Sequence, residues 1–211
     1  MDYSEIIEKK FTVGISAGLV YNSADFDGLG KIFNLLEENI PEETYQIPKS
    51  NSSFEASPLY RFSSLFIYKK KFMIEIVYAI SPSSDEISHF EYESFSGAVG
   101  YMFPILRNLS PYVSLGYSAS KFTAFNNNYG FTVDSSNGKL ESITLEGNVK
   151  GILMSFGVLY NITQNIGINI FGNYKFYPDV KVNSQSYSQN QKYPTVDAKG
   201  FEFGLSINFT N

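Results

Sequence analysis

The chain of 211 residues contains no cysteine and no tryptophan, and it has few charged side chains. The lack of cysteine excludes disulfide bridges, thiol nucleophiles and thiolate metal ligands. Charged residues make up 18 % of the chain, compared with about 25 % in a typical soluble domain. The net charge is −5 and the basic residues are spread along the sequence, so we expect no nucleic-acid partner.

A long apolar segment is also missing. No run of about 18 apolar residues occurs, which excludes a transmembrane helix. The N-terminal sequence MDYSEIIEKK is polar and charged, and it lacks the apolar core of a secretion signal. For an exported protein, we therefore expect that Met1 replaces a removed signal or that the chain is already the mature form.

Aromatic residues and a two-residue alternation are what the sequence has instead. Phenylalanine and tyrosine together account for 17 % of the chain. Eight segments alternate large apolar residues with small or polar ones and are predicted to be strands: 11–21, 59–68, 72–80, 89–103, 112–122, 149–160, 166–177 and 200–209. In the fourth segment the alternation changes phase after Tyr92, and we expect a β-bulge near Ser94.

The connections between these segments alternate in length. The short connections are 69–71, 104–111 and 161–165. The others are 22–58, 81–88, 123–148 and 178–200, and three of these four are long and rich in Asn, Ser, Asp and Gly. Short turns at one end and long loops at the other are typical of up-and-down membrane barrels, whose even strand count puts both chain ends on the short-turn side.

The face opposite the apolar one indicates what surrounds the barrel. It consists mostly of Gly, Ser, Thr and Asn, which fit the narrow interior of an eight-stranded barrel. A soluble barrel or β-sandwich would need charged side chains facing water there. Aromatic residues gather near the strand ends of the apolar face, as in the girdles of membrane barrels. We therefore predict an all-β, eight-stranded antiparallel transmembrane β-barrel.

Three stretches carry a resemblance to a known group: SPYVSLGYSAS, YNITQNIGINIFGNYKF and GFEFGLSINF. They resemble the small eight-stranded bacterial outer-membrane barrels of the OmpA/OmpX/OmpW-like group. The resemblance implies a barrel domain over 11–211, a short periplasmic segment over 1–10, periplasmic turns, extracellular loops, and integral location in the cell outer membrane with both termini periplasmic. It also implies contact with outer-membrane lipid and lipopolysaccharide, and a C-terminal assembly signal formed by Phe201, Phe203, Leu205, Ile207 and Phe209.

Ionisable residues occur on the predicted inward face. They are Arg61, Glu75, Glu93, Lys175 and Glu202. The predicted lumen charge network consists of Arg61, Glu75, Lys175 and Glu202. The strand order places Arg61, Lys175 and Glu202 at similar height, where they can neutralise one another. A polar path for small solutes is the alternative, but buried charges need partners and eight strands leave little free interior, so we favour a closed lumen.

The stretch DFDGLGKIFNLLEEN, residues 25–39, departs from the β pattern. Asp27 can cap a short helix and Pro41 ends it. Its apolar stripe, formed by Leu29, Ile32, Phe33 and Leu36, predicts a helix in the first loop that packs on neighbouring loops or docks on a partner. Its carboxylates match no calcium-loop spacing, so we expect no metal site.

The chemistry-bearing residues do not predict an enzyme. His89 is the only histidine, and its neighbour Ser88 would face the opposite side of a strand. We expect no catalytic site and no cofactor. The favoured function is a non-enzymatic structural or partner-binding outer-membrane protein, which includes the case of a subunit in a larger envelope complex with other outer-membrane proteins. A narrow pore for small solutes and a lipid-modifying enzyme are the alternatives.

Folding of this chain should require detergent or lipid, because one whole face of every predicted strand is apolar. Far-UV circular dichroism with and without micelles measures this dependence. A cooperative β-fold in plain buffer would contradict the membrane prediction.

Overall fold

The computed structural model describes residues 11–22, 58–81, 88–126, 143–177, 182–184 and 200–211. The strands in these ranges are β1 (Phe11–Asn22), β2 (Leu59–Tyr68), β3 (Phe72–Ile80), β4 (Ser88–Met102), β5 (Leu109–Asn126), β6 (Ile143–Asn161), β7 (Ile166–Phe176), β8 (Val182–Ser184) and β9 (Gly200–Thr210). The sequence-predicted segments correspond to β1–β7 and β9, and the predicted bounds of β2 and β3 are those of the structure.

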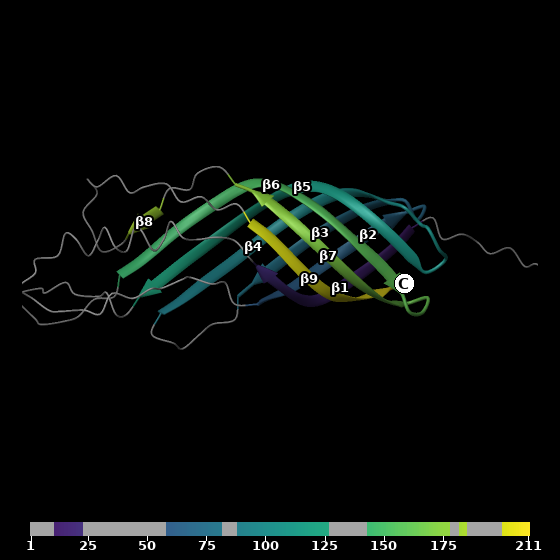
Figure 1. Ribbon diagram of the computed structural model, residues 1–211, viewed down its shortest axis with the longest axis horizontal. Helices are drawn as coiled ribbons and strands as arrows, with labels where there is room; N and C mark the ends of the chain where they lie inside the picture. Colours follow the sequence, from purple (N-terminus) through teal and green to yellow (C-terminus); the bar gives the residue numbers. More distant parts are fainter. Residues whose placement is uncertain (1–10, 23–57, 82–87, 127–142, 178–181, 185–199) are drawn as a thin grey trace, which may run out of the picture.

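The strands close into a barrel. Each strand pairs with its neighbours in antiparallel fashion in the order β5-β4-β3-β2-β1-β9-β7-β6, and β5 pairs with β6 to complete the circle (Figure 1). The three-residue β8 pairs with the far part of β6, opposite Leu145 to Gly147. The predicted eight-stranded up-and-down barrel is therefore confirmed.

Strand β4 corrects one prediction. Its register runs without an extra residue against β3, from Ile80 opposite Glu93 to Phe72 opposite Tyr101, and it is equally continuous against β5. The bulge expected near Ser94 is wrong. The phase change has another cause, because Tyr92 is an interior residue with 2 % of its surface exposed.

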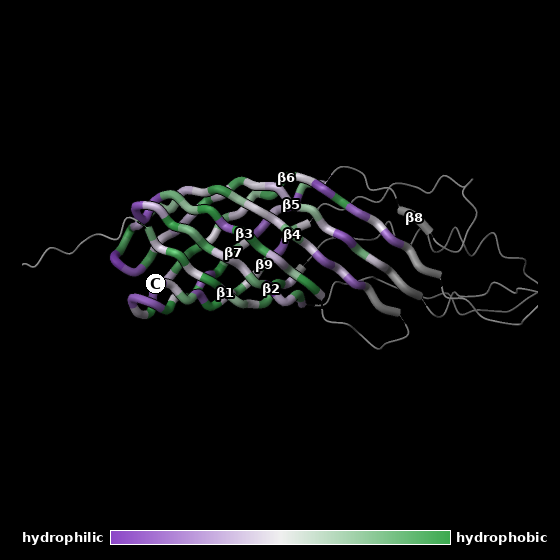
Figure 2. The backbone as a smooth tube through the Cα atoms, turned by 180° about the vertical axis from the view of Figure 1, so that it is seen from behind, coloured by the Kyte–Doolittle hydropathy of each residue, from purple (hydrophilic) through white to green (hydrophobic). Residues whose placement is uncertain are grey.

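The two faces of the barrel wall differ as the alternation predicts. The outer face carries large apolar residues, for example Ile15, Val99 and Ile170, whose exposed fractions are 64 %, 63 % and 61 %. The inner face carries serines and a few asparagines, four charged residues, and a set of aliphatic and aromatic side chains such as Leu65, Leu153 and Phe122. Figure 2 shows apolar segments along the barrel and hydrophilic ones in the short turns and on the far ends of β4–β6. Such an outer face suits hydrocarbon and not water.

Strands β4, β5 and β6 are longer than the others. They have 15, 18 and 19 residues, whereas β1, the longest of the remaining strands, has 12. Their additional length projects beyond the barrel at the end away from the C-terminus (Figure 1). The outward residues change there from apolar, such as Phe95, to polar, such as Glu93 and Lys121. This change marks the upper limit of the lipid-facing belt.

Large interior aromatic residues are seated against glycines of the neighbouring strand. The register pairs are Phe122–Gly147, Tyr112–Gly157 and Phe171–Gly204. A Cβ atom added at Gly204 would come within 2.3 Å of the Phe171 ring, and one at Gly147 would come equally close to Phe122. The missing side chain thus provides the space that an aromatic ring needs inside a narrow barrel.

Two predicted segments lie outside the described residues. These are the N-terminal segment 1–10 and the loop helix with its stripe of Leu29, Ile32, Phe33 and Leu36. Among the described ranges, no helix has the length and apolar character needed to span a membrane.

Replacing Ile170 with arginine should destabilise the folded barrel by roughly 2–4 kcal/mol, because the side chain projects from the middle of β7 into the lipid-facing belt. Gln164→Arg is the control, since Gln164 is exposed in a short turn. Urea titration of the barrel in lipid vesicles measures both variants. Equal tolerance of arginine at the two sites would contradict the assignment of the outer face.

Candidate functional site

A first ion pair lies inside the barrel between β2 and β3. The Arg61 Nη2 atom is 2.5 Å from Glu75 Oε1. Ser63 joins the pair, since Arg61 Nη1 donates to its hydroxyl at 3.2 Å and that hydroxyl donates to Glu75 at 3.1 Å. The guanidinium also lies 4.3 Å from the ring centroid of Phe171 on β7, three strands away around the barrel. Arg61 therefore contacts both sides of the lumen.

A second ion pair lies between β7 and β9. Lys175 Nζ is 2.6 Å from Glu202 Oε1, and Asn173 Nδ2 donates to the other carboxylate oxygen at 3.1 Å. The same ammonium group donates to the Tyr92 hydroxyl at 3.2 Å and to Ser94 Oγ at 3.1 Å, both on β4. Because β4 lies three strands from β7, Lys175 also connects distant parts of the wall.

A cluster of hydroxyl groups adjoins the second pair. Ser120 Oγ lies 2.8 Å from the Tyr177 hydroxyl and 2.9 Å from that of Tyr92, and it donates to Ser94 Oγ at 3.0 Å. Ser118 Oγ lies 3.0 Å from the Tyr177 hydroxyl. Buried hydroxyls are stable when they bond to one another in this way. The cluster joins β4 and β5 to the residue that follows β7.

The four charged residues predicted for the lumen network are all inside the barrel, but they are arranged as two pairs. Arg61 bonds to Glu75, whereas Lys175 bonds to Glu202. In the strand register, Glu202 lies opposite Asn22 of β1 and Arg61 lies opposite Gly18, four positions nearer the short-turn end. Arg61 therefore does not join Lys175 and Glu202 in one cluster, as we expected. The charges form two ion pairs in successive layers of the lumen.

Glu93, the fifth predicted lumen residue, faces outward, so that expectation is wrong. It is exposed and accepts a hydrogen bond of 2.9 Å from the Tyr78 hydroxyl. The cause is the continuous register of β4, which turns Glu93 outward because it turns Tyr92 inward.

The sequence alone did not identify Tyr92 and Tyr177 as interior residues. Tyr177 shares sequence parity with Asn173 and Lys175, which is the signal that could have identified it.

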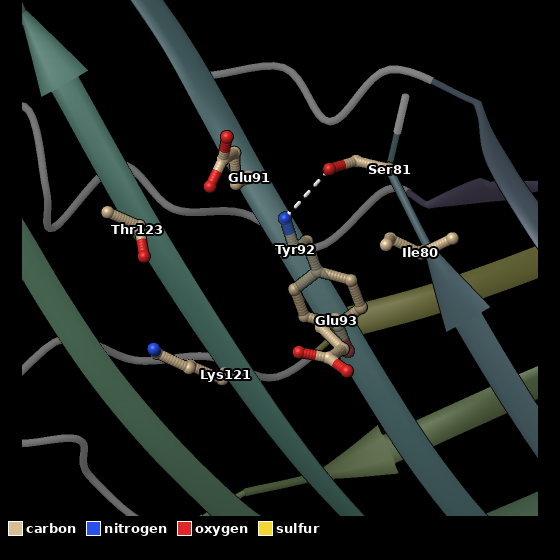
Figure 3. Close-up of a pocket in the computed structure, with 7 residues that line it drawn as sticks. All are labelled: Ile80, Ser81, Glu91, Tyr92, Glu93, Lys121 and Thr123. Atoms are coloured by element: carbon tan, nitrogen blue, oxygen red, sulfur yellow. Dashed lines mark hydrogen bonds between the residues drawn. The ribbon is translucent and has the colours of Figure 1, made fainter. Parts of the chain in front are cut away.

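A recess of about 330 Å³ lies on the outer wall where β3 ends beside β4 and β5. Figure 3 shows its lining residues, with Tyr92 N–H donating to Ser81 Oγ at 2.8 Å. The exposed charged side chains among them are Glu91, Glu93 and Lys121. Glu93 and Lys121 are register partners on adjacent strands. The recess thus presents charges of both signs at the upper limit of the lipid-facing belt.

The other predicted residues are placed as follows. The five residues of the C-terminal pattern, Phe201, Phe203, Leu205, Ile207 and Phe209, alternate outward along β9 and are exposed. His89 belongs to β4, but its side chain lies outside what the structure describes. Among the described residues, no cluster of three or more His, Asp or Glu side chains could hold a metal ion.

At the level of sequence, no protein-family model and no curated protein matches the chain. Solved structures do match. The chain is similar to Neisserial surface protein A, with 12 % identity, a TM-score of 0.54, and coverage of 95 % of this chain and 97 % of that one. Similarity to OprG from Pseudomonas aeruginosa has 12 % identity, a TM-score of 0.54 and 95 % coverage of both chains.

A third similar structure is Ail, the attachment invasion locus protein of Yersinia pestis. The identity is 14 %, the TM-score is 0.51, and the match covers 96 % of this chain and 99 % of Ail. Identities this low establish the fold and nothing finer. The chain therefore has the fold of the small bacterial outer-membrane β-barrels, as the sequence resemblance predicted.

Glu202→Gln should lower the melting temperature in detergent, because it leaves the buried Lys175 without its counter-charge. Breaking a buried pair costs about 3–5 kcal/mol. Adding Lys175→Met should recover part of the loss. Glu93→Gln is the matched control, since the same chemical change at an exposed carboxylate should cost less than about 1 kcal/mol.

Because Glu75 and Glu202 belong to different ion pairs in successive layers of the lumen, the losses from Glu75→Gln and Glu202→Gln should be additive. Thermal unfolding followed by circular dichroism measures all of these variants. Unchanged melting of Glu202→Gln, accompanied by altered single-channel conductance, would indicate a water-filled pore in place of a closed lumen.

Proposed function

We propose that this protein is a non-enzymatic, integral outer-membrane barrel with a closed lumen that presents a partner-binding surface outside the cell. The observation that carries the proposal is the set of side chains crossing the lumen. Arg61 reaches Phe171 and Lys175 reaches Tyr92, each across three strands. A lumen crossed by two buried ion pairs is poorly suited to solute passage, so the function is assigned to the outer surfaces.

The partner-binding surface is the extended sheet, defined as residues 88–93 of β4, 121–126 of β5 and 143–150 of β6. It continues the barrel wall beyond the outward residues Phe95 and Ile152, and it carries Lys121 and Lys150 on its exposed face. The proposal places this sheet outside the cell, with the short turns and both chain ends in the periplasm, as is usual for outer-membrane barrels.

Two classes of partner fit this surface. Lipopolysaccharide lies beside the upper limit of the lipid-facing belt, where the two lysines can meet its phosphates. Other outer-membrane proteins can pack on the extended sheet within a larger envelope complex. One protein of similar fold, Ail, was solved in complex with the heparin analogue sucrose octasulfate, which supports ligand binding by barrels of this type. The helix that the sequence predicts within residues 25–39 is a second candidate for docking on such a partner.

Site-specific photo-crosslinking in native outer membranes tests the proposal. A photoreactive residue at position 121 or 150 should give a discrete protein or lipopolysaccharide adduct, because both positions lie on the extended sheet. The same residue at position 170, in the lipid-facing belt, is the control and should give phospholipid adducts only.

Planar-bilayer recordings complete the test. We expect no stepwise conductance, because the ion pairs close the lumen. Ion-selective channels would replace the proposal with a narrow pore, and altered lipid A in cells that express the protein would replace it with a lipid-modifying enzyme.

A further inference from the structure

The short-turn end of the barrel carries a group of exposed cations. Lys69, Lys70 and Lys71 form the turn between β2 and β3, and Arg107 lies in the turn between β4 and β5. No aspartate or glutamate occurs in the described short turns, 69–71, 103–108 and 161–165. At the opposite end, by contrast, Lys121 of β5 lies opposite Glu93 of β4. We call the four cations the basic rim.

The backbone of the lysine turn is strained. Lys69 and Lys70 have φ angles of 51° and 54°, in the left-handed region that favours glycine and asparagine. Lys71 N–H donates to the Tyr68 carbonyl at 3.1 Å, which closes the turn. Hairpin turns with two positive φ angles strongly prefer Asn-Gly, so two lysines here cost stability. A role for their charge would explain why this chain has lysine at both positions.

Aromatic residues place the basic rim at the level of lipid headgroups. Tyr68 packs against Phe11 with ring centroids 4.9 Å apart, and Phe72 meets Tyr101 at 5.4 Å, so aromatic residues of the four strands β1–β4 lie beside the lysine turn. Such girdles sit at the membrane–water interface. The Lys69 ammonium lies 5.3 Å from the centroid of the Tyr68 ring, which holds that charge just beyond the girdle.

A cavity of about 780 Å³ opens at the same end, and both Lys70 and Arg107 line it. Amide and hydroxyl groups, including those of Asn108, Asn161 and Gln164, line its wall. Such groups bond well to the hydroxyls and ester oxygens of a lipid headgroup, and the two cations can neutralise a phosphate.

We propose that the basic rim binds the phosphate of an anionic phospholipid in the leaflet at the short-turn end, with the polar headgroup directed toward the cavity. The binding site requires the barrel to be inserted in a bilayer, but it is independent of the partner-binding surface at the other end. Charge complementarity, the strained lysine turn and the adjoining girdle carry the proposal together.

Native mass spectrometry of the full chain in neutral micelles, titrated with phosphatidylglycerol or phosphatidylcholine, tests the site. Phosphatidylglycerol should bind more tightly, and Lys69→Asn combined with Lys70→Gly should weaken its binding by about fivefold for each lysine removed. The same double variant should melt at a higher temperature in phosphatidylcholine, because Asn-Gly relieves the turn. A merely structural lysine turn would not give this combination of weaker lipid binding and higher stability.

Two control variants sharpen the comparison. Lys69→Arg with Lys70→Arg keeps the charge and should keep the preference for phosphatidylglycerol. Lys121→Gln with Lys150→Gln removes two charges at the opposite end and should leave that preference intact. If the double Asn-Gly variant fails to fold, Lys71→Gln with Arg107→Gln removes the other two charges of the basic rim without changing either strained position, and it should also weaken the binding of phosphatidylglycerol.

Three results would overturn the proposal. The first is equal binding of phosphatidylglycerol and phosphatidylcholine by the natural chain. The second is an equal loss of phosphatidylglycerol binding in the Lys121 and Lys150 control. The third is equally tight binding of glycerol 3-phosphate, which would identify a site for free phosphate esters.

Discussion

Closure of eight strands in lipid imposes the constraint on which the rest of this structure depends. Hydrocarbon outside the wall can satisfy no polar group, and the lumen is only wide enough for side chains. Every inward charge must therefore find its partner within the lumen. The pairs Arg61–Glu75 and Lys175–Glu202 meet this requirement. Their additional contacts with Phe171 and Tyr92 link strands that are not neighbours, so the same side chains also brace the cross-section of the barrel.

Sequence parity predicted the fold well because a strand wall has only two sides. The predicted bounds of β2 and β3 are those of the structure, and the inward positions of Arg61, Glu75, Lys175 and Glu202 followed from parity alone. Pairing could not be predicted in the same way, because long side chains reach several positions along and across the lumen. The prediction for Tyr92 was wrong because tyrosine is amphipathic. Its ring suits a lipid interface, but inside this barrel its hydroxyl group forms a hydrogen bond with Ser120.

The two ends of the barrel have different electrostatic characters. The short-turn end has the cations of the basic rim without nearby acidic residues in the described turns, whereas the far ends of β4–β6 carry glutamate and lysine side by side. With the closed lumen that we propose, neither end acts as the mouth of a channel. Each end can therefore be described as a separate surface, one facing headgroups and the other extending past them. The barrel holds the two surfaces at a fixed distance and orientation.

The glycine–aromatic pairs also bear on how the wall assembles. A strand that slips by two positions keeps its inward and outward faces, so alternation alone cannot correct the error. Such a slip would bring Phe171 against Glu202 or Ser206 in place of Gly204, where the ring would meet a side chain. The pairs Phe122–Gly147 and Tyr112–Gly157 impose the same penalty on the β5–β6 seam. The three pairs thus favour the correct strand register over registers that are shifted by two residues while the strands pair during insertion.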